Sequence, residues 1–518
     1  MSGKTGNSTY SPTLRAQVLG GTKWTLISNV LSVPSRFAIS IILVRYLSRQ
    51  DYGTYRIVLD LSAAMIYLVS LGIQHSISRY VPEMLERRQF SSIVRMIGGM
   101  LGLRLVVNLI LLTVLALSWR KLFEFFNLPL VLASSLSLIL LYILLQRTVE
   151  VFGEYFHTAY MDLRTQTIHD SIKDIAFICG IVATGLWNWR LQGVLWTLVA
   201  SELVGLAVYG SSTLKHAFNL MKWQDRESAE KTPLPIGRIV HYSGYNMLYT
   251  FSGLVVGVSI DSFIVAKFMG MDQVALYTFG LGLIMMVHSL NPLTFFKPIF
   301  NNIFIRKYTQ TGDKTILSRG MAFSVKLGLF IALPGLAGVC LLADPIIRYI
   351  YRPDYLIALP VIYLFAIMFL FRCLNIILTF VVNTLELVKY FTWLYIAGLI
   401  KLAAAIALTW LWGIVGMAIA TCSVEIIWSA MLVYIVKIKG GIPLKLMDRS
   451  YASILLNTSL MSLFVLALRG WIGGLVSLFS IVVAGICIYF GLSLVKKPFC
   501  ADEREMVNTF LKRKIMVF

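Results

Sequence analysis

Long apolar runs separated by short polar stretches make up almost the whole chain. A membrane-spanning helix needs about 20 mostly apolar residues, and fourteen stretches meet this requirement. They lie at about 24–46, 54–78, 95–118, 128–149, 172–188, 191–214, 238–266, 272–296, 319–343, 356–384, 390–411, 414–436, 450–469 and 472–495. The pattern predicts an all-α polytopic membrane protein with about 14 transmembrane helices, whose short loops leave no room for a soluble catalytic domain.

Composition and charge support this interpretation. Hydrophobic residues make up 58% of the 518 positions and charged residues only 14%, whereas a soluble globular chain carries about 25% charged residues. These values exclude a cytosolic enzyme, a secreted disulfide scaffold and a disordered protein. The net charge of +21 lies mainly between the apolar runs, which indicates basic cytoplasmic loops and no nucleic-acid partner.

The distribution of lysine and arginine predicts the orientation. With the N-terminus in the cytoplasm, the tails and even-numbered loops hold 31 of these residues and the opposite side holds 10. Because basic loops stay in the cytoplasm, we expect a multi-pass protein of the cytoplasmic membrane with both termini inside. The sequence has no zinc-ligand spacing, phosphate-binding loop or catalytic-serine motif, so we expect no enzyme activity, no metal site and no resident cofactor.

Similar segments recur along the chain at a near-constant offset. Residues 187–193 (WNWRLQG) and 410–416 (WLWGIVG) are each followed nine residues later by a glutamate, Glu202 and Glu425, at an offset of 223. Residues 46–55 and 268–277 match at an offset of 222. Several matches at one offset indicate an internal duplication.

Each repeat contains six predicted spans, and an even number gives both halves the same orientation, as in a parallel repeat. Two similar bundles with a cleft between them are typical of an alternating-access transporter. The predicted parts are an N-terminal lobe (1–214), a cytoplasmic linker (215–237), a C-terminal lobe (238–436), and two further helices with a cytoplasmic tail (437–518).

Charged side chains inside the predicted spans are the candidate functional groups. Such a charge costs roughly 2.5–3.5 kcal/mol on insertion scales, so it normally faces a cavity or another charge. The bases are Arg36, Arg104, Lys326, Arg372 and Lys401, and the acids are Asp60, Glu202, Asp261 and Glu425. A surplus of guanidinium groups suits a phosphate-bearing or acidic ligand, and intramembrane ion pairs that only fix helix packing are the alternative.

Arg36 is the most informative of these bases. Serines at positions 28, 32, 35 and 40 follow helical spacing with it, which predicts a polar stripe along the first span. Pro34 removes a backbone hydrogen bond and should bend this helix. We expect the stripe to face a watery cavity, and pairing of Arg36 with Asp60 is the alternative.

The other polar positions allow two interpretations each. Glu202 and Glu425 could be protonatable coupling groups or hydrogen-bonding contacts between helices, and Asp261 is the better candidate for coupling to an ion. Tyr245 and Tyr249 lie on an aromatic, polar helix face on which sugar rings could stack, or which could pack against another helix.

The N-terminal third carries motifs of a known family. They are Gly21–Trp24, VRYL at 44–47, DYGxY at 51–55, LGxxxS at 71–76 and RYVPE at 79–83. This pattern resembles the polysaccharide transport family of the multidrug/oligosaccharidyl-lipid/polysaccharide flippase superfamily, over about residues 15–440. Asp261 and Tyr277 are similar to the second-half version of the motif, where the segment MDQVALY lacks the glycine.

The resemblance implies two six-helix lobes in a V around a cationic cavity. It implies transfer of a polyprenyl-pyrophosphate-linked oligosaccharide to the outer leaflet, with Arg36, Arg104 and Arg372 holding the pyrophosphate or acidic sugars. Lys326 and Lys401 complete the candidate set of bases. Membrane lipids, a glycan polymerase and other surface-polysaccharide assembly proteins are the expected partners, and any coupling would be to Na⁺ or H⁺ through the four acids.

Three other functions are alternatives to this one. A cation-coupled multidrug exporter of the same superfamily should have a net acidic cavity, whereas the embedded charges here are five bases and four acids. A polysaccharide polymerase or ligase needs a large outer loop, and the longest one here is about a dozen residues, at 344–355. A scaffold without transport is the third.

Overall fold

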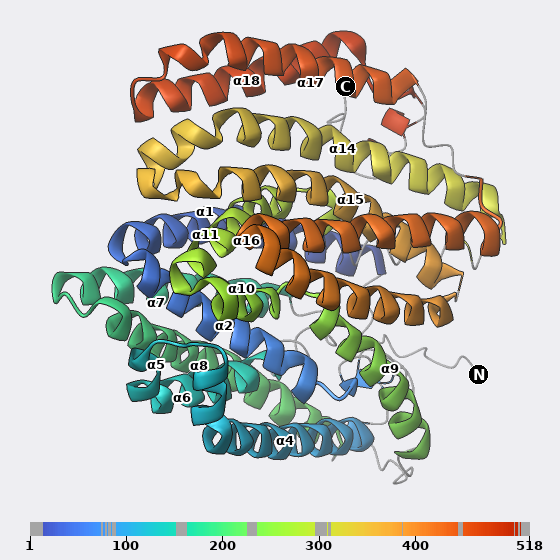
Figure 1. Cartoon of the computed structure of the whole chain (residues 1–518). Coiled ribbons are helices and arrows are strands. Elements are labelled where there is room, and N and C mark those ends of the chain that lie inside the picture. The colour runs from blue at the N-terminus through green and yellow to red at the C-terminus, as the bar shows by residue number, and fades with distance from the viewer. Residues whose placement is uncertain are drawn as a thin grey trace, which may run out of the picture. The chain divides into compact units, whose positions relative to one another are not determined.

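The computed structural model describes residues 14–73, 90–151, 163–224, 236–295, 312–385, 387–443 and 449–501, with a few single residues between and after these ranges. All regular secondary structure in this part of the chain is helical, as predicted (Figure 1). Eight of the described helical segments are long and apolar enough to cross a membrane. The count of fourteen spans stays a prediction.

Two examples show why the counts differ. The predicted spans 390–411 and 414–436 fall within one continuous apolar segment, Lys389–Lys439. The predicted span 172–188 lies in a helix, Leu163–Leu186, that carries Asp170, Lys173 and Asp174, and these charges make it less apolar than the eight segments.

The helices form two compact units, each with its own core. Unit 1 comprises Met1–Arg36, Met65–Ser118 and Ser135–Thr250, and unit 2 comprises Phe37–Ala64, Trp119–Ser134 and Phe251–Phe518. The boundaries fall inside helices, because unit 2 contains the end of the first helix and the start of the second. The predicted lobes, 1–214 and 238–436, stay a prediction.

Unit 1 is built from long helices that precede residue 250. They are α1 (Leu14–Tyr46) up to Arg36, α2 (Arg49–Val69) from Met65, α4 (Phe90–Phe125) up to Ser118, α6 (Leu136–Val151), α7 (Leu163–Leu186), α8 (Arg190–Gln224) and α9 (Ile236–Val256) up to Thr250. Helices α7 and α8 form an antiparallel hairpin, in which Gly180 and Gly193 let the backbones approach side chains of Thr197 and Thr184.

Unit 2 contains the remaining elements. They are α5 (Leu130–Ser134), α10 (Asp261–Met269), α11 (Met271–Ser289), α12 (Pro292–Phe295), α14 (Lys314–Pro345), η2 (Ile346–Ile350), η3 (Pro353–Ala358), α15 (Leu359–Thr384), η4 (Val388–Phe391), α16 (Thr392–Tyr434), η5 (Ile435–Lys439), α17 (Arg449–Leu468), η6 (Arg469–Trp471) and α18 (Leu475–Lys496). Helices α17 and α18 lie side by side and pack on α14 through an apolar cluster that includes Phe330, Met461 and Tyr489 (Figure 1).

Helix α16 turns back on itself at Gly413. This residue has φ 60° and ψ −141°, a conformation that favours glycine. The two halves then run antiparallel, so that the Trp393 and Tyr434 rings at its two ends lie only 6.1 Å apart. Both ends of α16 therefore lie at the same end of unit 2.

Candidate functional site

Lys401 and Asp261 form an ion pair that is buried inside unit 2. The Lys401 ammonium is 2.7 Å from Asp261 Oδ1, and the two side chains are 2% and 1% exposed. Lys401 also donates to the Gly257 carbonyl at 2.8 Å. The hydroxyls of Tyr277 and Thr421 donate to Asp261 Oδ2 at 2.9 and 2.8 Å. A predicted ligand-binding base and a predicted coupling acid thus neutralise each other.

Lys326 likewise has a carboxylate partner. Its ammonium donates to Glu503 Oε1 at 2.9 Å and to the Ser450 hydroxyl at 3.3 Å. The ring of Tyr451 lies 6.0 Å from it. Because Ser450 and Tyr451 begin α17 and Glu503 follows α18, these contacts attach the last two helices to α14.

Unit 1 also pairs its embedded charges internally. Arg104 on α4 and Arg147 on α6 both donate to Glu150 Oε2, at 3.2 and 2.6 Å. Lys173 on α7 donates to Glu202 on α8 at 2.6 Å. Glu150 and Lys173 were not among the predicted residues, because Glu150 directly follows the predicted span 128–149 and Lys173 is the second residue of the span 172–188.

Arg372 and Glu425 make a looser pair in unit 2. Arg372 Nε lies 3.8 Å from Glu425 Oε1, and the arginine side chain is 37% exposed. Asn375 Nδ2 donates to the other oxygen of Glu425 at 2.8 Å, while the Ser429 hydroxyl donates to Asn375 Oδ1 at 2.7 Å. The Arg372 side chain is therefore only partly buried.

Arg36 is exposed on α1 in unit 1. Within the described part of the chain no carboxylate lies at ion-pair distance from Arg36. Asp174 on α7 is an acid with which the Arg36 charge interacts over a longer distance. The expected polar stripe is only partly realised, because Ser32 is buried and Ser35 donates to the Leu31 carbonyl of its own helix at 2.9 Å. Arg36 and Arg372 are the two predicted bases with exposed side chains.

The remaining predicted residues have different surroundings. Asp60 accepts a hydrogen bond from Ser262 and lies 3.9 Å from Arg56, one turn earlier on α2. It belongs to unit 2, whereas Arg36 belongs to unit 1. The side chains of Tyr245 and Tyr249 lie outside the described residues.

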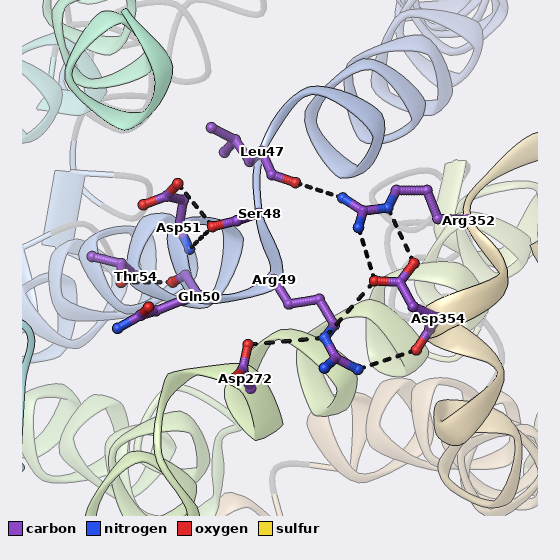
Figure 2. A network of polar contacts seen from close by, with 9 residues as sticks. All are labelled: Leu47, Ser48, Arg49, Gln50, Asp51, Thr54, Asp272, Arg352 and Asp354. Carbon is purple, nitrogen blue, oxygen red and sulfur yellow. Dashed lines mark hydrogen bonds and ion pairs between the residues drawn. The ribbon is translucent and has the colours of Figure 1, made fainter.

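The turn between α1 and α2 is held by a polar network within unit 2 (Figure 2). Arg49 Nε lies 3.9 Å from Asp272 on α11 and 3.8 Å from Asp354 on η3. Arg352 donates to the Leu47 carbonyl at 3.0 Å and through two nitrogens to the Asp354 carboxylate at 3.1 and 3.0 Å. We call these five residues the turn network.

The local sequence prepares this turn. Ser48 directly precedes α2 and accepts a hydrogen bond from the Asp51 amide at 3.1 Å, while its own hydroxyl donates to the Asp51 carboxylate at 2.8 Å. The first contact is the usual N-cap bond, in which a serine oxygen accepts from an amide of the first helical turn, and the second links the two side chains. This start of the helix places Arg49 at the first position of α2, where its side chain points to η3 and α11 (Figure 2).

Gly53 brings α2 into direct contact with α11. A Cβ atom at this position would lie 2.1 Å from the Met271 carbonyl oxygen and 3.3 Å from the Ala275 amide nitrogen. The two segments related by the sequence repeat, 46–55 and 268–277, therefore pack against each other. Only one partner of such a close crossing needs to be glycine, which explains why the second segment has alanine where the first has Gly53.

The turn network should contribute little to stability by itself. Its charged side chains are about one-third to one-half exposed, and exposed ion pairs contribute about 0–1 kcal/mol. We expect Arg49→Ala to lower the free energy of unfolding by less than about 1 kcal/mol, measured by thermal unfolding in detergent. A loss of more than about twice that value would show that Arg49 is essential to the packing of the turn.

Comparisons with known proteins agree with the motifs and the fold. The polysaccharide biosynthesis protein family matches residues 18–304. An uncharacterized membrane protein of Methanocaldococcus jannaschii, MJ1068, is 21% identical over 427 residues, which cover 79% of this chain and 81% of that protein.

Two solved structures share the fold. The lipid II flippase MurJ in an inward closed conformation superposes with a TM-score of 0.60 and 16% identity, over 96% of this chain and 100% of that one. An inward-facing multidrug resistance MATE transporter superposes with a TM-score of 0.58 and 12% identity, over 80% of this chain and 99% of that one. Since the family match covers more than half of the residues, this chain belongs to the polysaccharide biosynthesis protein family, within the flippase superfamily that its motifs resemble.

Proposed function

We propose that this protein moves a polyprenyl-pyrophosphate-linked oligosaccharide from the cytoplasmic to the outer leaflet of the cytoplasmic membrane, for cell-surface polysaccharide biosynthesis. The observation that carries the proposal is membership of the polysaccharide biosynthesis family over residues 18–304. The fold shared with flippases and exporters is consistent with transport by alternating access, and the basic loops support a topology with both termini in the cytoplasm.

Arg36 and Arg372 are the proposed ligand-binding residues. The Arg36 residue is exposed and the Arg372 side chain is 37% exposed, and a planar guanidinium can donate two parallel hydrogen bonds to a phosphate. Arg104, Lys326 and Lys401 each have a carboxylate partner within 3.2 Å in the same unit. We therefore assign these three bases to helix packing. Of the five bases predicted from the sequence to bind the ligand, two then remain.

The ion-pair distances also rank the four acids as candidates for coupling to Na⁺ or H⁺. Asp261 and Glu202 are in ion pairs of 2.7 and 2.6 Å, and breaking such a buried pair is costly. Asp60 and Glu425 make longer ion pairs, of 3.9 and 3.8 Å. In this proposal Asp60 and Glu425 are the better candidates for binding and releasing a cation.

Complementation of a bacterial strain that lacks a lipid-linked oligosaccharide flippase tests the function, with surface glycan as the readout. We expect the wild-type chain to restore the glycan and Arg36→Ala to reduce transport at least about tenfold, since a hydrogen bond to a charged group contributes about 1.5–3 kcal/mol. Ser35→Ala is the matched control, because this hydroxyl bonds within its own helix and its loss should leave transport unchanged.

Two results would count against the proposal, and a third would extend it. Full transport by an Arg36→Ala variant expressed at the normal level would remove the ligand-binding role of this residue. Failure of the wild-type chain to complement, together with resistance to cationic drugs in the same cells, would instead identify a multidrug exporter. Complementation that depends on a co-expressed glycan polymerase would add the partner predicted from the sequence.

A further inference from the structure

Three lysines lie near the turn at Gly441, which follows α16 and η5. Lys437 and Lys439 lie on η5 and are exposed, as is Ile438 between them. The chain then turns at Gly441, which has φ 63°. A Cβ atom at Gly441 would lie 3.3 Å from the ammonium of Lys314, at the start of α14. A third lysine thus reaches the same turn from another helix.

Aromatic rings line one side of these lysines. Tyr434, one helical turn before Lys437, is 45% exposed and lies 6.1 Å from the Trp393 ring. Trp393 in turn contacts Tyr390 edge-on at 5.4 Å, and the Lys389 ammonium lies 5.3 Å from the Tyr390 ring. We call Lys314, Lys437, Lys439, Trp393 and Tyr434 the lysine–aromatic cluster.

The three lysines form no ion pair with an acid in the described part of the chain. Asp313 adjoins Lys314, but its two carboxylate oxygens accept hydrogen bonds from the amide and hydroxyl of Thr315 at 2.7 and 2.8 Å, which caps α14. Within the described ranges, no carboxylate forms an ion pair with Lys314, Lys437 or Lys439. The three lysines therefore carry three positive charges against the single carboxylate of Asp313.

The cluster lies at one end of an apolar helix pair. The segment Lys389–Lys439 is among those apolar enough to cross a membrane, and only 33% of an 18-residue apolar stretch within it is buried. Exposed apolar residues continue along both halves of the hairpin, namely Ile396, Leu399, Ile400, Ile426, Ile427 and Ile438. Tyrosine and tryptophan concentrate where hydrocarbon meets the headgroups, so the lysines lie at headgroup level.

We propose that the lysine–aromatic cluster binds the phosphate headgroup of an anionic phospholipid from the cytoplasmic leaflet. Anionic lipids attract a lysine near the membrane surface with about 1 kcal/mol each, and the exposed apolar faces of α16 provide contact area for the acyl chains. This site is independent of the proposed transport cargo, since it uses neither Arg36 nor Arg372.

Lipid binding to the purified full-length protein tests the proposal. The probes are phosphatidylglycerol and phosphatidylcholine, titrated into a neutral detergent and measured by native mass spectrometry. We expect the wild type to prefer phosphatidylglycerol and the double variant Lys437→Gln/Lys439→Gln to bind it about thirtyfold more weakly, which corresponds to about 2 kcal/mol for two lysines.

A matched control removes the same charge elsewhere. Lys496 and Lys497 are also two exposed lysines that follow an apolar helix, α18, on the same predicted side. The double variant Lys496→Gln/Lys497→Gln should change the affinity less than about threefold, while Lys437→Arg/Lys439→Arg should keep it. Thermal unfolding of each variant shows whether it is folded.

Three outcomes would overturn the proposal. Equal losses in the two glutamine variants would show that only net charge matters. Equal binding of phosphatidylcholine and phosphatidylglycerol would show that the headgroup charge is not recognised. Binding of a polyprenyl phosphate at this cluster without phosphatidylglycerol binding would assign the cluster to the lipid carrier instead.

Discussion

Asp261→Ala is expected to lower the free energy of unfolding by about 3–5 kcal/mol, the usual loss when one partner of a buried ion pair is removed. The substitution leaves the Lys401 ammonium without its carboxylate at a position that is 2% exposed. It also removes the acceptor of the Tyr277 and Thr421 hydroxyls. Thermal or denaturant unfolding in detergent measures the change.

Two further variants separate the unpaired charge from the lost carboxylate. The double variant Asp261→Leu/Lys401→Met removes both charges and should recover much of the stability, because a well-packed apolar pair can replace a buried ion pair. Asp272→Ala removes an exposed carboxylate from α11, which is adjacent to α10, and should cost less than about 1 kcal/mol. A loss of the same size in Asp261→Ala and in the double variant would show that the unpaired ammonium is not the cause.

Gly53→Ala is expected to destabilise the protein by about 3 kcal/mol, the upper end of the usual range for overpacking. The added methyl group would lie 2.1 Å from a backbone carbonyl oxygen of Met271. A backbone atom cannot rotate away as a side chain can, so α2 and α11 must separate. The same unfolding measurement applies, together with the surface-glycan assay.

Gly282→Ala provides the matched control in α11. A Cβ atom there would have no heavy atom within 4 Å, and alanine is a better helix former than glycine by about 1 kcal/mol. This variant should therefore be as stable as the wild type or slightly more so. Wild-type stability in Gly53→Ala would contradict the direct backbone contact between α2 and α11.

The repeat in the sequence did not predict the ion-pair partners. Glu202 and Glu425 occupy equivalent positions, at an offset of 223. Glu202 pairs with Lys173 from α7, whereas Glu425 contacts Arg372 and Asn375 from α15. A repeat preserves the position of a residue on its helix, but the partner depends on which neighbouring helix also carries a polar side chain.

The sequence did not predict the turn network, for a related reason. Arg49 lies between two recognisable motifs, at 44–47 and 51–55, but its partners Asp272 and Asp354 follow more than 200 and 300 residues later. Each partner taken alone is an ordinary acid in the first turn of a helix. Only their joint position around the α1–α2 turn identifies them as a set.

The sequence by itself determined the helical class, the membrane location and the family, because hydropathy, loop charge and short motifs are properties of local segments. It also located the embedded charges, since a charge within an apolar run is visible without any structure. Only the tertiary structure decided that Arg104, Lys326 and Lys401 are neutralised inside their own units while Arg36 and Arg372 stay exposed. The physical reason is that ion pairs form over about 3 Å between helices distant in sequence, and no local pattern encodes that approach.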